Sequence, residues 1–282
     1  MRLLHIVSIG QRPNVISRIE ELGLVDYLAE EKMKVYEDDD VWENVFAVIR
    51  EFDLFYRTEP EYSEEDFSAA SFFMIFPRTI YGYPENSNRS GYLETTYDGN
   101  SRCDLCGVGA VQVNPFKVRA VPSLRKKSIF LLNWVFDEFF LATEKWRSLI
   151  ARFGLETKTV LKGSEELTNV KQLLVAEQVE LEMPANFETE TCIRCGASKF
   201  VSSCLQRFTP EPKIRTETRS AIFKSVQWFG SGGQAFHLVV ITREFYDALN
   251  AEGITDIYFF PCGITPITKL TKTHRTPTSK SN

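Results

Sequence analysis

The chain has 282 residues, of which 43% are hydrophobic, 13% aromatic and 25% charged. This composition is typical of a globular protein and excludes an intrinsically disordered chain. The formal net charge is −5 and the pI is near 5.5, which argues against strong binding to nucleic-acid phosphates.

The sequence predicts neither an export signal nor a membrane span. His5 and Ser8 interrupt the short apolar stretch at the N-terminus, whereas an export signal needs about 7 to 15 apolar residues before a cleavage site. No apolar run approaches the roughly 20 residues that cross a membrane. We therefore expect a cytoplasmic protein without a membrane partner, whose cysteines stay reduced.

The first third of the chain has patterns of both strand and helix type. Residues 3–9 predict a short buried strand. Apolar residues close to helical spacing predict one helix over residues 14–31 and another over 41–52. An acidic N-terminal region of mixed helix and strand is therefore expected, extending through residue 98.

The next segment begins with a helix signal and ends in an irregular connection. Ser63, with Asp66 three residues later, resembles a helix cap ahead of an apolar run that Pro77 ends. Residues 81–100 are rich in Gly, Asn, Ser and Tyr without clear periodicity, which indicates an irregular connection and a soft domain boundary. Four tyrosines there could be partly buried or could anchor an interface: Tyr81, Tyr83, Tyr92 and Tyr97.

Acidic residues concentrate near the N-terminus. Through residue 100 there are 20 acidic and 9 basic residues, whereas the remainder has 18 acidic and 24 basic residues. The acidic residues form two runs: Glu37, Asp38, Asp39 and Asp40, then Glu59, Glu61, Glu64, Glu65 and Asp66. Such runs are either a solvated surface or a docking surface that favours a basic protein over nucleic acid.

The last two thirds of the chain read as a degenerate duplication. When Thr143 is aligned with Thr242, Trp146 matches Phe245, Ile150 matches Leu249 and Gly154 matches Gly253. Each Thr can cap a helix of about three turns, and each Gly can end it, with an apolar strand on either side. Upstream, residues 128–130 with Trp134 match residues 221–223 with Trp228, and aromatic residues near Trp134 are expected in the core.

Two CxxCG motifs are the strongest chemical signal. Two residues between the cysteines let both thiolates face one ion, and the following glycine permits the tight turn of a metal-binding knuckle. Together the knuckles provide the four-sulfur shell that Zn²⁺ prefers, from Cys103, Cys106, Cys192 and Cys195. Because 85 residues, 107 through 191, lie between Cys106 and Cys192, the site must be assembled by the fold.

Structural zinc is the leading interpretation, with an iron–sulfur or redox centre and a site that has lost its metal as alternatives. Cys204 and Cys262 have no CxxC partner and are expected to be small buried hydrophobic residues. A shell of four thiolates leaves no open position for water, so this zinc should not be catalytic.

No catalytic residue is predicted. The three histidines, His5, His237 and His274, lie outside any recognised catalytic motif. The Gly-rich stretch at residues 230–233 lacks the lysine and hydroxyl residue of a phosphate-binding loop and reads as a hairpin turn. An enzyme with an unrecognised site is a hypothesis for which nothing in the sequence speaks directly.

The paired motifs, the similar units downstream of them and the apolar ending at residues 238–261 resemble the bacterial double-CxxCG motif family. The resemblance covers roughly residues 70–265. It implies an immunity protein that neutralises a cognate bacterial toxin by direct binding, with metal ligands at Cys103, Cys106, Cys192 and Cys195.

The sequence therefore predicts an α+β fold with a duplicated strand-helix-strand unit and a split four-cysteine knuckle pair. Its predicted parts are residues 1–98, a zinc-binding region at 99–267 and a disordered tail at 268–282. The expected function is toxin binding in bacterial competition, with one structural Zn²⁺ per chain and the toxin facing Glu37, Asp38, Asp39, Asp40, Glu61, Glu64, Glu65 and Asp66. The alternative is a zinc-ribbon module that binds nucleic acid through the more basic back half, including Arg125, Lys126 and Lys127.

Overall fold

The computed structural model describes residues 1–263 apart from residues 86–90, 126, 184–186, 202–208 and 214–219. Helices and several sheets occur together, which confirms the α+β class. The described chain divides into one unit of residues 1–63 and another of residues 64–263. This division precedes the boundary drawn near residue 98 because the strand at residues 72–77 is part of the second unit; the tail expected at 268–282 lies outside the described residues.

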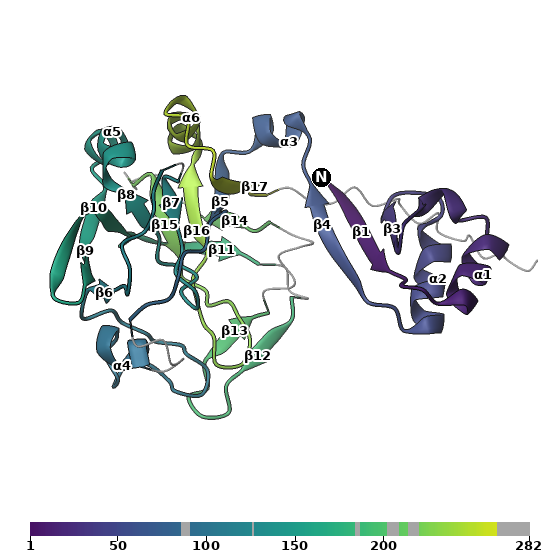
Figure 1. The fold of residues 1–282 in the computed structure, drawn as a ribbon, viewed down its shortest axis with the longest axis horizontal. Helices are drawn as coiled ribbons and strands as arrows, with labels where there is room; N and C mark the ends of the chain where they lie inside the picture. The colour runs from purple at the N-terminus through teal and green to yellow at the C-terminus, as the bar shows by residue number, and fades with distance from the viewer. Residues whose placement is uncertain (86–90, 126, 184–186, 202–208, 214–219, 264–282) are drawn as a thin grey trace, which may run out of the picture. The chain divides into compact units, whose positions relative to one another are not determined.

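The first unit is built from short strands and helices (Figure 1). Its elements are β1 (Arg2–Ser8), α1 (Pro13–Glu21), the 3₁₀ turn η1 (Val25–Tyr27), β2 (Leu28–Ala29), β3 (Lys32–Tyr36), α2 (Trp42–Phe52) and β4 (Tyr56–Glu61). Its described strands form an antiparallel sheet in the order β2-β3-β1-β4. Apolar residues of α1 and α2, such as Val15 and Val48, join Val35 of β3 in one buried cluster.

The predicted first strand and second helix of this unit are confirmed, but the first helix is shorter than predicted. The helix expected over residues 14–31 ends at Glu21. The later apolar residues do not continue it, because the chain passes through η1 into a β2–β3 hairpin that pairs with β1 from Leu4↔Tyr36 to Ser8↔Lys32. Pairing of β2 with β3, which is itself held by β1, therefore overrides the helical periodicity in this stretch.

The second unit contains the remaining described elements. They are α3 (Glu64–Ala69), β5 (Phe72–Pro77), α4 (Gly91–Thr96), β6 (Phe116–Lys117), β7 (Ile129–Phe130), β8 (Phe140–Ala142), α5 (Thr143–Phe153), β9 (Glu156–Lys162), β10 (Glu165–Leu174), β11 (Gln178–Glu182), β12 (Thr189–Thr191), β13 (Ser198–Phe200), β14 (Glu211–Lys213), β15 (Ile222–Ser225), β16 (Val239–Thr242), α6 (Arg243–Ala251) and β17 (Ile257–Pro261). Among the described residues the sheet orders are β6-β9-β10-β8-β7, β14-β11-β15-β16-β5-β17 and β12-β13. The connection expected to be irregular thus includes the short helix α4.

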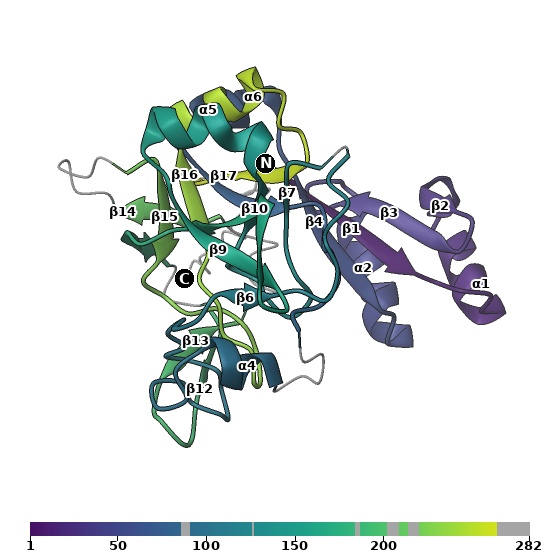
Figure 2. The ribbon, with the colours of Figure 1, turned by 60° about the vertical axis from the view of Figure 1, so that its left-hand side comes forward.

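Helices α5 and α6 lie side by side at one end of this unit, with α4, β12 and β13 at the other end (Figure 2). The two residues matched by the duplication meet there: the rings of Trp146 and Phe245 are 6.2 Å apart, and both side chains are fully buried. Burying each such side chain contributes about 1.5–3 kcal/mol to stability. Helices from the two halves therefore close one shared core.

The predicted helix ends are confirmed in three cases and wrong in one. Gly154 and Gly253 both have left-handed backbone conformations at the ends of α5 and α6. Thr242 caps α6 by accepting a hydrogen bond from the Phe245 backbone N–H at 3.3 Å. Thr143 instead lies inside the first turn of α5, and its buried hydroxyl has no partner among the described residues.

Pairing registers reveal how the two halves of the second unit are interlocked. Strand β8 pairs antiparallel with β7 and β10, and β10 pairs with β9. Strand β16 pairs antiparallel with β15 and β5, and β5 pairs with β17. Each half begins with the strand before its knuckle, so β5 opens the first half and β10 opens the second. Strand β5 nevertheless pairs with β16 and β17 of the second half, and β10 pairs with β8 and β9 of the first. We call this arrangement the strand exchange.

The strand exchange keeps equivalent positions in register. Ala142 of β8 faces Val170 of β10, and Ile241 of β16 faces Phe73 of β5. The same alignment matches Ile129, which faces Leu141, with Phe223, which faces Val240. The sequence match had paired Ile129 with Ile222, so the structure moves this part of the match by one residue. The order and sense of four strands are otherwise the same in both halves, which supports the duplication.

Candidate metal centre

Each CxxCG motif forms a tight turn whose backbone is hydrogen-bonded in the same way. In the first knuckle, Cys103 N–H donates to Val108 O at 2.9 Å and Gly107 N–H donates to Cys103 O at 2.8 Å. In the second, Cys192 N–H donates to Ala197 O at 2.8 Å and Gly196 N–H donates to Cys192 O at 2.9 Å. Gly107 and Gly196 have φ of +81° and +72°, a conformation that favours glycine.

The fold brings the two knuckles together. The sulfur atoms of Cys103 and Cys192 are 3.9 Å apart, and those of Cys106 and Cys195 are 3.6 Å apart. All four Sγ atoms lie within 4.8 Å of one another. A tetrahedral centre with metal–sulfur bonds of about 2.3 Å has sulfur–sulfur distances of about 3.8 Å. The spacing and the donor set therefore fit one tetrahedral metal ion, and these distances are too long for disulfide bonds.

Backbone N–H groups favour the thiolate form of one cysteine in each knuckle. The N–H groups of Cys195 and Arg194 lower the pKa of Cys192 to about 7. The Cys106 N–H lowers the pKa of Cys103 in the same way. Burial has the opposite effect at Cys106, where it raises the thiol pKa to about 12. A cation bound at the centre would offset this penalty, because metal coordination deprotonates a thiol.

A buried lysine that the sequence analysis did not identify supports the first knuckle. Lys199 lies on β13 and has no exposed side-chain surface. Its Nζ donates to the carbonyl oxygens of Gly232 at 2.6 Å, Gln234 at 3.0 Å and Cys106 at 3.2 Å. A single lysine thus links the β12–β13 hairpin to the Gly-rich turn and to the metal-ligand residue Cys106. No local signal distinguishes it from a surface lysine on an alternating strand.

The Gly-rich turn packs directly on the first knuckle. Phe229 and Phe236 form an antiparallel bridge on either side of it, which confirms the predicted hairpin turn. A Cβ atom on Gly107 would lie only 2.8 Å from the carbonyl oxygen of Gly233, so the close approach requires glycine. Outside this contact, Arg194 of one knuckle forms a 2.7 Å ion pair with Asp104 of the other.

The other cysteines and histidines have separate locations. Cys262 is buried away from the four-sulfur cluster, as expected for a small hydrophobic residue, and burial raises the pKa of its thiol. Cys204 and His274 lie outside the described residues. His5 is buried in the first unit, where it contacts Thr58 and Glu37 through its two ring nitrogens.

The predicted partner-binding acids are divided between the two units. In the first unit, Glu37 contacts His5, Asp38 and Asp39 pair with Arg2, and Glu61 accepts a hydrogen bond from the Tyr36 hydroxyl; Asp40 is in the same unit. Glu64, Glu65 and Asp66 belong to α3 of the second unit. Several of these charges therefore stabilise local structure within the first unit.

A cavity of about 880 Å³ opens beside the first knuckle and is partly formed by Asp104 and Gly107. Trp134 and Trp228, which the duplication matches to each other, both line it. Its acidic side chains are Glu94, Asp98, Asp104, Asp137 and Glu138, and its basic ones are Arg102 and Lys224. The cavity therefore has an excess of three negative charges.

Fold and site together define a duplicated α+β protein with a four-cysteine centre that can hold a metal ion. No protein-family model matches the chain, and no curated protein matches its sequence. Among the described residues, no helix is both long and apolar enough to cross a membrane.

Proposed function

We propose that the chain is an immunity protein that binds and neutralises a cognate bacterial toxin, with one structural Zn²⁺ held by Cys103, Cys106, Cys192 and Cys195. The observation that carries this proposal is the closed four-sulfur cluster, to which each half of the duplicated unit contributes one knuckle. The same cysteines carry the resemblance to the double-CxxCG motif family. That resemblance supplies the immunity function.

Zinc suits this centre because it prefers four sulfur ligands in a tetrahedral arrangement. Four protein thiolates leave no position for a water molecule or a substrate, so the ion stabilises the scaffold and the protein acts by binding. It functions in the cytoplasm, where thiols remain reduced.

The proposed partner is a basic toxin domain. Charge complementarity supports this choice, because both the first unit and the cavity beside the first knuckle have an excess of acidic residues. Nucleic acid is a poorer partner for the same reason, since phosphates are repelled by these surfaces. The proposal therefore favours a protein partner over the zinc-ribbon alternative.

Growth rescue tests the function directly. A candidate toxin domain would be expressed under an inducible promoter in a sensitive bacterial host, with and without the chain. We expect rescue by the intact chain, a complex of the two purified proteins, and loss of both with the Cys103→Ser/Cys192→Ser variant. Continued toxicity together with the absence of a complex would overturn the proposal.

A further inference from the structure

The walls of the cavity beside the first knuckle are rich in aromatic rings. They include Tyr92, Tyr97, Trp134, Phe136 and Trp228. Trp134 is stacked near Tyr92, with ring centroids 6.3 Å apart, and Trp228 lies 3.8 Å from the ring of His237. The π faces of tryptophan and tyrosine attract cations, most strongly where water is partly excluded. The walls therefore suit a flat or elongated group that carries a positive charge.

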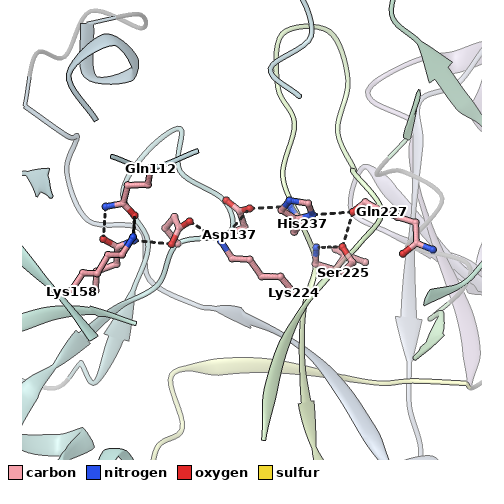
Figure 3. Close-up of polar contacts among 10 residues, drawn as sticks. Gln112, Asp137, Lys158, Lys224, Ser225, Gln227 and His237 are labelled. Carbon is pink, nitrogen blue, oxygen red and sulfur yellow. Dashed lines mark hydrogen bonds and ion pairs between the residues drawn. The ribbon is translucent and has the colours of Figure 1, made fainter. Parts of the chain in front are cut away.

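The cavity lining contains one lysine that pairs with two carboxylates, and Figure 3 shows this lysine, Lys224, beside Asp137. Lys224 Nζ lies 2.7 Å from Glu138 Oε1 and 3.6 Å from Asp137 Oδ2, and all three side chains are largely buried. The second oxygen of Glu138 accepts a hydrogen bond from Gln172 at 2.8 Å. Lys224 is shared by the two carboxylates, so two negative charges face one positive charge at this point of the lining.

Asp137 retains binding capacity. Its Oδ2 atom accepts the His237 backbone N–H at 3.0 Å, while its Oδ1 atom has no hydrogen-bond partner within the part of the chain that the structure describes. This oxygen is not among the buried polar atoms that lack a partner, so it is accessible to a donor. Asp137 therefore provides an acceptor with a negative charge on the cavity wall.

His237 provides a second acceptor. Its Nδ1 lies 3.2 Å from the carbonyl oxygen of Gln227, so Nδ1 carries the proton and donates it (Figure 3). Burial lowers the pKa of His237, which keeps the ring neutral and its Nε2 atom available as an acceptor. The cavity thus combines aromatic faces, two carboxylates that share one lysine, and a neutral histidine.

We propose that this cavity binds the guanidinium group of an arginine side chain from the partner protein. A guanidinium group has five N–H donors in a planar fork, which suits the acceptors of Asp137 and His237, and its faces can stack on Trp134 or Trp228. This inference deepens the proposed function, on which it rests, by assigning the toxin-binding site to the knuckle side of the second unit. It differs from docking on the acidic runs near residues 37–40 and 61–66.

The test uses the full metal-loaded chain and two small probes. N-acetyl-arginine methylamide and its citrulline counterpart differ only in the charged guanidinium, which is a neutral urea in citrulline. Indole N–H signals in ¹⁵N NMR spectra report binding, because Trp134 and Trp228 line the cavity, whereas Trp42 and Trp146 do not and serve as internal references. We expect the arginine probe to shift only the first two signals, with the citrulline probe roughly tenfold weaker.

A variant pair localises the effect. Asp137→Asn keeps an oxygen for the His237 N–H but removes the charge, and it should weaken arginine binding roughly tenfold. Glu144→Gln changes an exposed acid on α5 that pairs with Arg147 outside the cavity, and it should have no effect. A change in the Trp146 signal would reveal that Asp137→Asn disturbs the fold. In that case the comparison of arginine with citrulline on the unaltered chain still decides whether the cavity recognises the guanidinium charge.

Several results would overturn the inference. These are equal shifts from both probes, unmoved signals of Trp134 and Trp228, or unchanged arginine binding in a folded Asp137→Asn variant. Tighter binding of free agmatine than of an arginine within a peptide would assign the cavity to a small cation instead of a protein. A toxin complex unaffected by Asp137→Asn would overturn the cavity assignment alone, whereas arginine binding without any toxin complex would overturn the proposed function alone.

Discussion

The stability of the second unit should depend on the concentration of free zinc with a slope set by a single site. The four sulfur atoms form one cluster, so folding is linked to binding of one ion. Each tenfold increase in free Zn²⁺ above the dissociation constant should then add about 1.4 kcal/mol to the free energy of unfolding. Because each half contributes one knuckle, opening of either half releases the ion, and β8 and β16 should respond equally.

Hydrogen exchange followed by mass spectrometry measures this dependence, because peptides from each element are read separately. With free zinc set by a metal buffer, amides of β8 and β16 should show the expected slope, while those of β1 in the first unit should not change. Cys103→Ser/Cys192→Ser should abolish the slope. Cys262→Ala, which removes a buried thiol outside the cluster, should retain it. The single shared centre would be refuted if exchange protection of β8 and β16 did not depend on free zinc, or if it rose with the slope expected for two bound ions.

Three further predictions concern individual side chains. Gly196→Ala should lower the free energy of unfolding by about 1 kcal/mol, because the φ of Gly196 is +72° and the new Cβ has open space around it. Gly107→Ala should lower it by about 2–4 kcal/mol, because its Cβ would also lie 2.8 Å from Gly233 O. Thermal unfolding of the two variants measures this difference. Thr242→Val should lower the free energy of unfolding by about 1 kcal/mol, because it removes the cap of α6. Thr143→Val should raise it by about 1 kcal/mol, because the buried hydroxyl that it removes has no described partner. Urea midpoints that shift in the same direction would contradict this contrast. Burial lowers the pKa of His237 below its unfolded value of about 6.5. Its contribution to stability is therefore fully present above the unfolded pKa and is lost as the pH falls from there through the lower folded pKa. The urea midpoint of His237→Gln should vary less between about pH 7.5 and 5.5 than that of the unaltered chain.

Local chemistry explains which features the sequence could predict. A CxxCG motif specifies its own turn, so both knuckles could be predicted from a few residues each. The matched residues of α5 and α6 were also identifiable, because Trp146 and Phe245 occupy the same place in two similar patterns. The motifs alone could not establish that the knuckles meet, since the fold brings together sulfur atoms 89 positions apart in the sequence.

Long-range contacts determine what the sequence did not reveal. Lys199 has the same local setting as an exposed strand lysine, and only its three carbonyl acceptors show its role. The cavity combines Asp137 and Glu138 from one half with Lys224 and His237 from the other, so neither segment predicts it alone. The helix predicted through residue 31 failed for a related reason, because pairing of β3 with β1 is decided across the sheet.

The strand exchange has a consequence for synthesis of the chain on the ribosome. When β5 emerges, its sheet partners β16 and β17 do not yet exist, since they lie more than 150 positions later in the sequence. At that stage neither knuckle has emerged, and after the first one does, the nascent second unit still has only half of the ligands for a metal ion. Unlike duplicated proteins whose repeats fold one after the other, this unit can complete neither its second sheet nor its metal centre until both halves have been made. The newly made β5 is thus a candidate for chaperone protection during translation.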